Sequence, residues 1–188
     1  MGDSRTGAIR SFDTIYALFK LIAEGRIRHL PARAGATLDF VPIDHVASGL
    51  VALAEAMPRA AGGRYHLVSG APIAVSEWAA AIGAYPQFTA PVLVDPAAFD
   101  PAALAPAELR LFARISALYA SYFQRDPRFD DTQFSAATGL ACPSTGAAFM
   151  RRLIDHCIAA GFLNGAIEHA DSAPPAGRAR RRPTSARP

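Results

Sequence analysis

The segment TLDFVPIDHVASGLVALAEAM, residues 37–57, restricts the possible folds more than any other part of the chain. A strand is predicted for residues 37–41, and Pro42 then leads to Asp44, which is placed to cap a helix. Apolar residues recur along that helix at helical spacing, so we expect them to face the core: Val46, Leu50, Leu53 and Met57. A strand that passes directly into an amphipathic helix indicates a mixed α/β protein.

Further short elements follow from the same patterns. Helices are predicted at 12–24, 76–83, 107–124, 131–138 and 144–161, and extended segments at 26–30, 64–69 and 92–95. The first helix carries Phe12, Ile15, Phe19 and Ile22 on one stripe and ends at Gly25, and Ser76 is expected to cap the helix that begins there. No internal repeat occurs, and no Gly-rich turn joins a strand to a helix as in dinucleotide-binding folds.

Length and composition favour one folded domain. The chain has 188 residues, of which 51% are hydrophobic and 19% charged, enough apolar surface to form a single core. No apolar run is long enough to cross a bilayer and no signal peptide begins the chain, so we expect a cytoplasmic protein without a membrane span. Two cysteines without CxxC spacing exclude a disulfide framework, and Cys157 lies in an apolar helical pattern that predicts a buried side chain.

The net charge of +3 comes from the end of the chain. Residues 1–163 carry equal numbers of basic and acidic side chains, whereas residues 164–188 are rich in Pro, Ala and Arg. Such a tail cannot bury enough apolar surface to order itself, so we expect it to be disordered. Because the body is neutral, no nucleic-acid partner is expected; weak binding of phosphates by the tail is a less favoured alternative.

Tyr16 and Lys20 form a Y-x-x-x-K pattern, the spacing that places a catalytic phenol beside an ammonium group in short-chain dehydrogenases. Only 15 residues precede Tyr16, too few for a βαβ cofactor unit, so we expect Tyr16 to line a pocket or the core instead. Asp44 and His45 are adjacent and cannot face each other on a helix, which favours Asp44 as a cap over a general-base pair. The histidines lack metal-ligand spacing, so no metal site is predicted.

Four segments, in order, resemble the second half of an extended short-chain dehydrogenase/reductase, in the branch of thioester reductases and fatty acyl-CoA (male-sterility type) reductases. They are GDSRTGAIRSFD, DFVPIDHVASGLVALAEA, GGRYHLVSGAPIAVSEWAAAIG and FDDTQFSAATGLACPSTGAAFMRRLIDHCIAAGFL. The resemblance covers residues 2–163 and implies the C-terminal part of an NAD(P)-binding Rossmann-like domain with a mostly helical substrate-binding cap. Residues 164–188 form the separate basic tail.

The resemblance also implies roles for particular residues. Gly2, Asp3 and Ser4 match the loop that approaches the nicotinamide, and Phe12 and Tyr16 fall in the substrate-side cap. The family's Gly-rich turn, catalytic Ser or Thr and Tyr–Lys pair would precede Met1, so we expect no catalytic residue in this chain. NAD or NADP would serve the complete enzyme, and we expect this chain alone to bind neither.

The function expected from the sequence is therefore the substrate-binding portion of an NAD(P)-dependent reductase. It would act on a carbonyl or acyl thioester and be inactive alone, as an N-terminally truncated chain. The alternative is a stand-alone, non-catalytic module that binds a small ligand or a partner. An exposed sheet edge would allow self-association. The substrate, and the choice between NAD and NADP, stay open at this point.

Overall fold

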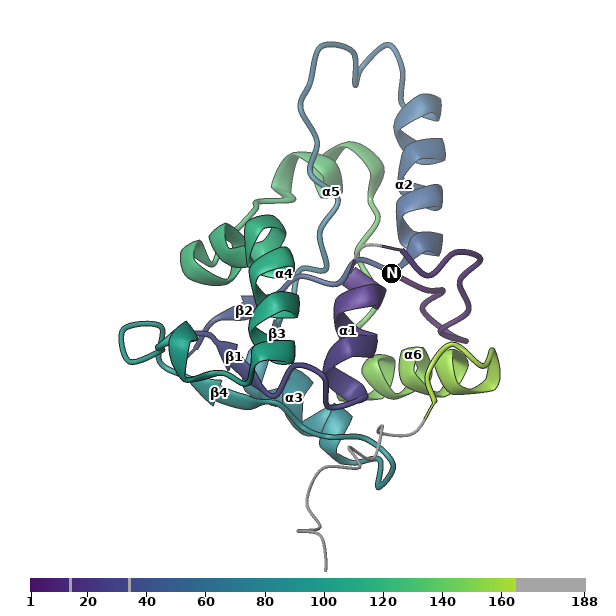
Figure 1. The fold of residues 1–188 in the computed structure, drawn as a ribbon. Coiled ribbons are helices and arrows are strands. Elements are labelled where there is room, and N and C mark those ends of the chain that lie inside the picture. The colour runs from purple at the N-terminus through teal and green to yellow at the C-terminus, as the bar shows by residue number, and fades with distance from the viewer. Residues whose placement is uncertain (14, 34, 165–188) are drawn as a thin grey trace, which may run out of the picture.

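The computed structural model describes residues 1–13, 15–33 and 35–164, with the side chains of residues 116–125 left out. Its elements follow the predicted α/β order. They are α1 Ile15–Ala23, β1 His29–Pro31, β2 Thr37–Leu38, α2 Ile43–Glu55, β3 Ile73–Ala74, α3 Val75–Gly83, β4 Val92–Val94, the 3-10 helix Pro101–Ala103, α4 Pro106–Arg125, α5 Thr132–Thr138 and α6 Ala147–Ala159 (Figure 1). The predicted basic tail, apart from Asn164, lies outside the described residues.

The strands form two small sheets. β1 and β4 run parallel, with His29 opposite Val92 and Pro31 opposite Val94, whereas β2 and β3 are antiparallel, with Thr37 opposite Ala74. Two-stranded sheets are marginal alone, so helix packing must support them. The helices α1, α3 and α6 gather beside these strands in the lower part of Figure 1.

One hydrophobic core joins α1, α3 and α6. Phe19 of α1 lies 6.2 Å, ring centre to ring centre, from Trp78 of α3, so the buried Trp78 side chain packs between these helices. Cys157 is buried in the same core, as predicted. The largest contributors are Tyr16, Leu18, Phe19, Ile22, Ile27, Leu38, Val75, Trp78, Ile82, Phe149, Leu153 and Ile154.

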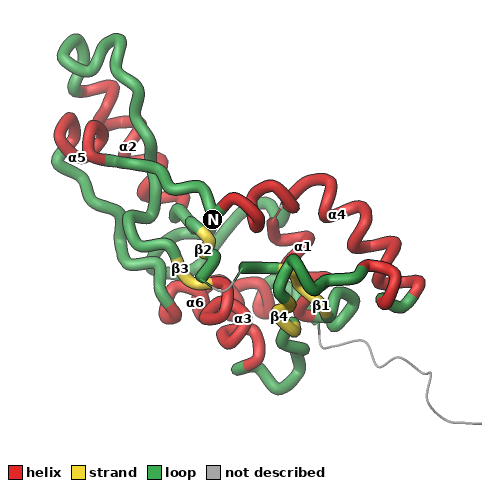
Figure 2. Tube along the Cα trace, turned by 90° about the vertical axis from the view of Figure 1, so that its left-hand side faces the viewer, coloured by secondary structure: helices red, strands yellow, loops and turns green. Residues whose placement is uncertain are grey.

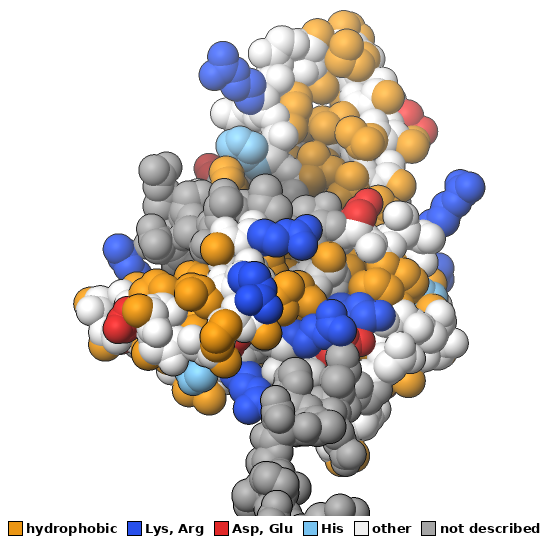
Figure 3. Space-filling model, viewed as in Figure 1, with side chains coloured by type: hydrophobic (Ala, Val, Ile, Leu, Met, Phe, Trp, Pro, Cys, Tyr) orange, Lys and Arg blue, Asp and Glu red, His pale blue; other side chains and the backbone are white. Residues whose placement is uncertain are grey.

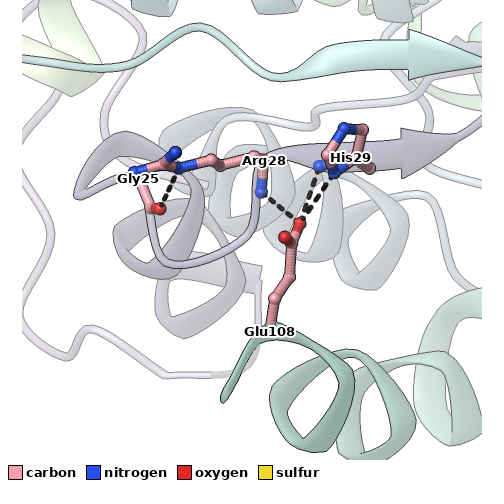
Figure 4. A network of polar contacts seen from close by, with 4 residues as sticks. All are labelled: Gly25, Arg28, His29 and Glu108. Carbon is pink, nitrogen blue, oxygen red and sulfur yellow. Dashed lines mark hydrogen bonds and ion pairs between the residues drawn. The ribbon is translucent and has the colours of Figure 1, made fainter. Parts of the chain in front are cut away.

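Glu108, in the first turn of α4, ties that helix to the start of β1. Its carboxylate is 8% exposed and accepts hydrogen bonds from the backbone N–H of Arg28 at 2.7 Å and of His29 at 2.9 Å (Figure 4). The same oxygen lies 3.2 Å from His29 Nδ1. A buried carboxylate that satisfies two backbone donors fixes the angle at which α4 leaves the core.

α2 and α5 form a projecting lobe above the core (Figures 1 and 2). They pack through the buried Phe134 of α5, which lies edge-on to His45 of α2 at 5.6 Å, and a Cβ on Gly49 would lie 2.9 Å from the Phe134 ring. α2 therefore turns His45 and Gly49 inward, and this contradicts the predicted inward face. Leu50 and Met57 are more than half exposed, because the glycine at position 49 allows Phe134 of α5 to approach a different side of the helix.

Three local predictions were wrong. The segment 64–69 forms no strand, because no neighbouring strand pairs with it among the described residues. Asp44 does not cap α2: the N-cap is Pro42, and the Asp44 carboxylate instead accepts hydrogen bonds from Ser4. Ser76 does not cap α3 either, since the helix begins one residue earlier with Ala74 at the N-cap position.

Candidate functional site

The N-terminal loop, residues 1–13, lies against α1, α2 and α6 and defines the candidate site. Every backbone N–H from Gly2 to Ile9 donates a hydrogen bond within the protein. The acceptors are Tyr16 Oη, Ala8 O, Asp44 Oδ1, Asp3 Oδ1 (twice), Asp3 O, Thr6 Oγ1 and His156 Nε2. These bonds hold the loop in place, and no amide from Gly2 to Ile9 is free to bind an anionic phosphate.

Glycine is required where the loop touches itself and α6. A Cβ on Gly2 would lie 2.1 Å from the carbonyl oxygen of Gly7. Gly7 has φ of +74°, and its Cβ would lie 2.2 Å from the carbonyl oxygen of Arg152 in α6. These approaches are far below van der Waals contact, so no other residue type fits at either position without displacing the loop.

Ser4 is held from two sides. Its N–H and Oγ donate to the two carboxylate oxygens of Asp44 at 2.9 and 2.6 Å, and its carbonyl accepts from Nε of Arg152 at 3.0 Å. Burial raises the pKa of Asp44, but the hydrogen bonds from Ser4 outweigh it and hold that pKa below its ordinary value. The predicted cofactor contact Ser4 is therefore a buried residue that joins α2 to α6 through the loop.

Asp3, another predicted cofactor contact, organises the turn that follows. Its Oδ1 accepts from the N–H of Arg5, and from the N–H and Oγ1 of Thr6. The side-chain hydrogen bond from Thr6 is the main cause of a lowered pKa at Asp3. Its other carboxylate oxygen and the exposed Arg5 side chain are the charged groups that this turn presents to solvent.

The predicted substrate residues Phe12 and Tyr16 lie together in an aromatic cluster. Phe12 stacks on Phe162 with ring centres 4.3 Å apart, and it meets Tyr16 edge-on at 5.6 Å. His156 of α6 completes the cluster at 5.9 Å from Phe12. Residues from both ends of the described chain thus form one wall of the candidate site.

Tyr16 and Lys20 bind different groups and not each other. The Tyr16 hydroxyl accepts a hydrogen bond from Gly2 N at 3.0 Å, and burial raises its pKa to about 12, the reverse of what a catalytic phenol needs. Lys20 Nζ donates to the carbonyl of Phe162 at 2.7 Å and lies 3.6 Å from Glu24. Each group is thus engaged elsewhere, and the absence of a catalytic role for this motif stays a prediction.

An apolar pocket lies beneath the loop and is lined almost entirely by hydrophobic side chains. It holds about 20 Å³ of space for a water-sized molecule, so it has room for one water and not for an acyl chain unless a wall moves. Tyr16 lines it, as predicted from the sequence. The other lining residues are Met1, Ile15, Phe19, Phe40, Trp78, Met150, Leu153 and Ile154.

The two cysteine thiols are poor nucleophiles in this structure. Burial raises the pKa of Cys142 to about 11 and that of Cys157 to about 12, so neither thiol forms a thiolate readily. Within the described part of the chain, no group of three His, Cys, Asp or Glu side chains could hold a metal ion. None of the described helices is long and apolar enough to cross a membrane.

Comparison with known proteins agrees with the resemblance predicted from the sequence. The sequence model of the NAD-binding family described as "Male sterility protein" matches residues 1–50, which include the loop, α1 and the start of α2. No curated protein matches the chain significantly.

Two solved structures have a similar fold. The terminal R domain from the myxalamid PKS-NRPS biosynthetic pathway superposes with a TM-score of 0.65 at 24% identity over 88% of this chain and 44% of its own. A thiolation-reductase di-domain from an archaeal non-ribosomal peptide synthetase superposes with 0.62 at 18% identity, over 86% and 34%. The predicted fold class, a mixed α/β fold similar to part of a Rossmann-like domain, is thus confirmed. The chain spans less than half the length of either relative.

Sequence reasoning found Gly2, Asp3, Ser4, Phe12 and Tyr16, and the structure places all five in or beside the loop. It missed Arg152, His156 and Phe162, which approach the loop from α6 and the residues after it. No local pattern marks these three, because they act through contacts with residues about 150 positions earlier. The proposed contacts with cofactor and substrate stay predictions.

Proposed function

We propose that this chain forms the substrate-binding portion of an NAD(P)-dependent reductase that acts on a carbonyl or an acyl thioester. The observation that carries the proposal is the shared pocket. Met1, from the loop that the family sequence matches, and Tyr16, from the predicted substrate side, line the same apolar cavity. An apolar cavity beside this loop suits the alkyl part of an acyl group.

In this proposal a nicotinamide cofactor, when bound to the complete enzyme, supplies the hydride. The loop would contact it through Gly2, Asp3 and Ser4. Because the amides of residues 2–9 are all engaged, these contacts would use carbonyl oxygens, the Asp3 carboxylate and van der Waals surface. No amide of residues 2–9 is free to bind a pyrophosphate, so the isolated chain should neither bind NADPH nor oxidise it.

The acyl group would lie along the aromatic wall of Phe12 and Phe162 and extend into the pocket. Met150 on the pocket wall is flexible enough to repack around an alkyl chain, which the present volume does not admit. The chemical step would use a proton donor outside the described residues, since the Tyr16 hydroxyl is buried and its pKa raised.

Trp78 provides the experiment, since it is the chain's single tryptophan, is buried and lines the pocket. A medium-chain acyl pantetheine should shift its fluorescence in a saturable way. Met150→Phe should weaken the titration by about tenfold because it fills the cavity. Met57→Phe is the matched control, at an exposed position outside the pocket.

The outcomes separate the two candidate functions. Ligand binding without NADPH binding supports a substrate-binding portion, whereas reduction of the thioester by the isolated chain would contradict it. A stand-alone ligand-binding module is the second candidate, because the whole pocket is built from residues of this chain. That candidate predicts full affinity for the acyl ligand in the isolated chain, with no gain when a nucleotide-binding half is added.

A further inference from the structure

Basic side chains gather on one side of the molecule, over α4 and the end of α1. The loop after α1 contributes the exposed Arg26 and Arg28, and α4 contributes the exposed Arg110 and Arg114, which lie one helical turn apart. Figure 3 shows Lys and Arg side chains clustered near the centre of this view. Because residues 1–163 carry equal numbers of basic and acidic side chains, this cluster is a local concentration of positive charge.

The carboxylates beneath this cluster are buried and do not neutralise all of it. Glu24 lies 3.6 Å from Lys20 Nζ and 3.8 Å from Arg26 Nε. Glu108 accepts two backbone N–H groups and contacts the His29 ring. Within the part of the chain that the structure describes, three guanidinium groups have no ion pair with a carboxylate: those of Arg28, Arg110 and Arg114.

Aliphatic side chains lie among these cations. Leu109 precedes Arg110 in α4 and is 36% exposed, and Val92 of β4 is 56% exposed. Val92 lies in register beside His29, whose ring contacts Glu108 in the first turn of α4, so strand and helix form adjoining parts of one surface. Figure 3 shows hydrophobic side chains between the Lys and Arg side chains there. The basic face, as we call this surface, consists of Arg26, Arg28, Val92, Leu109, Arg110 and Arg114.

We propose that the basic face binds the surface of a membrane that contains anionic lipids. Its arginines would contact the headgroup phosphates, to which a guanidinium group donates paired hydrogen bonds. The negative surface potential of such a membrane attracts clustered Lys and Arg residues, and the exposed Val92 and Leu109 add apolar area at the boundary of the acyl layer. This inference is independent of the proposed function, which concerns the pocket beneath the N-terminal loop.

A nucleic acid or an acidic protein fits the basic face less well. Single-stranded nucleic acids stack their bases on aromatic side chains, whereas the exposed apolar members of this face are Val92 and Leu109. Protein interfaces collect their apolar residues in a buried centre with charged residues at the rim, whereas here the aliphatic side chains are interspersed with arginines. Mixed Arg and aliphatic side chains on a helix surface are typical of binding at a lipid–water interface.

The test is sedimentation of the full chain with vesicles that contain about one quarter phosphatidylglycerol in phosphatidylcholine, compared with vesicles of phosphatidylcholine alone. We expect binding to the anionic vesicles only, weakening as NaCl is added. Arg110→Glu combined with Arg114→Glu should lower the affinity by at least about tenfold. The matched control is Arg59→Glu combined with Arg64→Glu, which makes the same charge change at exposed positions in the segment after α2.

Two further variants keep the result interpretable. Arg110→Gln combined with Arg114→Gln removes the charges without reversing them and should cause a smaller loss in the same direction. Leu109→Ser should weaken vesicle binding severalfold without changing its salt dependence, because it removes apolar area and no charge. All these positions are exposed, so the circular dichroism of each variant should match that of the unmodified chain.

Three results would overturn the inference. They are equal binding to neutral vesicles, binding that the Glu variants of Arg110 and Arg114 leave unchanged, and stronger binding to duplex DNA or poly-glutamate than to the anionic vesicles. The second would assign the binding to the arginines of residues 178–187, which every variant retains. The third would identify a nucleic acid or an acidic protein as the partner. Neither arginine lines the apolar pocket, so failure here is separate from failure of the Trp78 titration.

Discussion

Gly49 and Leu50 are neighbours in α2, and the structure predicts that a substitution of Gly49 destabilises the protein more than truncation of Leu50. The sequence pattern assigns Leu50 to the core, whereas in the structure it is 59% exposed. Gly49 is buried, and a side chain there would meet Leu67 Cδ2 at 2.6 Å and Phe134 Cζ at 2.9 Å. We therefore expect Gly49→Val to destabilise the protein more than Leu50→Ala does.

The magnitudes follow from burial. Complete burial of a leucine side chain stabilises by about 1.5–3 kcal/mol, so a side chain less than half buried should lose about 0.5–1 kcal/mol on truncation. A buried Leu50 would instead cost about 2–5 kcal/mol. Overpacking at Gly49 should cost about 1–3 kcal/mol, offset by a few tenths for the better helix propensity of valine, which leaves a net loss of about 2 kcal/mol.

Thermal unfolding followed by far-ultraviolet circular dichroism measures the difference. For a domain of this size about 1 kcal/mol corresponds to about 2–4 °C in Tm, so Gly49→Val should lower Tm by about 4–8 °C and Leu50→Ala by less than about 4 °C. The reverse order would refute the reasoning, because it would mean that α2 buries its apolar stripe within the isolated chain.

Three further outcomes are expected. Asp44→Asn should cost about 1–2 kcal/mol of folding free energy by weakening both hydrogen bonds from Ser4. Because the pKa of Asp44 in the folded protein lies below its ordinary value, the carboxylate stabilises fully above about pH 4, and this stabilisation is lost as the pH falls through the lowered pKa. Chemical denaturation at a series of pH values should therefore show a shallower acid dependence in the variant. Tyr16→Phe should cost about 1–2 kcal/mol of folding free energy, because it leaves the N–H of Gly2 unpaired. In a spectrophotometric pH titration the variant should lack one phenol with a pKa of about 12, and loss of a phenol with the ordinary pKa of about 10 would contradict a buried hydroxyl. Glu108→Ala should cost about 2–3 kcal/mol in chemical denaturation because two backbone donors lose their acceptor, and an unchanged midpoint would contradict the link between α4 and β1.

Much of the fold follows from local patterns in the sequence. Helical spacing and turn residues predicted all six α-helices that the described residues form, and Gly25 ends α1 with φ of +70° as a helix-terminating glycine should. These signals depend on residues within one or two helical turns of each other, so the local sequence is sufficient to recognise them. The order of short segments also predicted the resemblance to reductase domains, whereas the site roles of Gly2, Ser4, Phe12 and Tyr16 stay predictions.

Tertiary structure alone decided which groups these residues contact. Asp44 has the residue type of a helix cap, but Ser4, forty positions earlier, donates two hydrogen bonds to its carboxylate. Residues 64–69 have the composition of a strand, but a strand forms only when another strand satisfies its backbone.

The inward face of α2 is the clearest case. Helical periodicity shows that a helix has an apolar side, but the side that is buried depends on which element approaches it. Here Phe134 of α5 packs against Gly49, and the stripe that includes Leu50 is left outside. The sequence by itself thus determined the elements and their amphipathic character, whereas only the packing of distant segments decided which surface forms the core and which stays exposed.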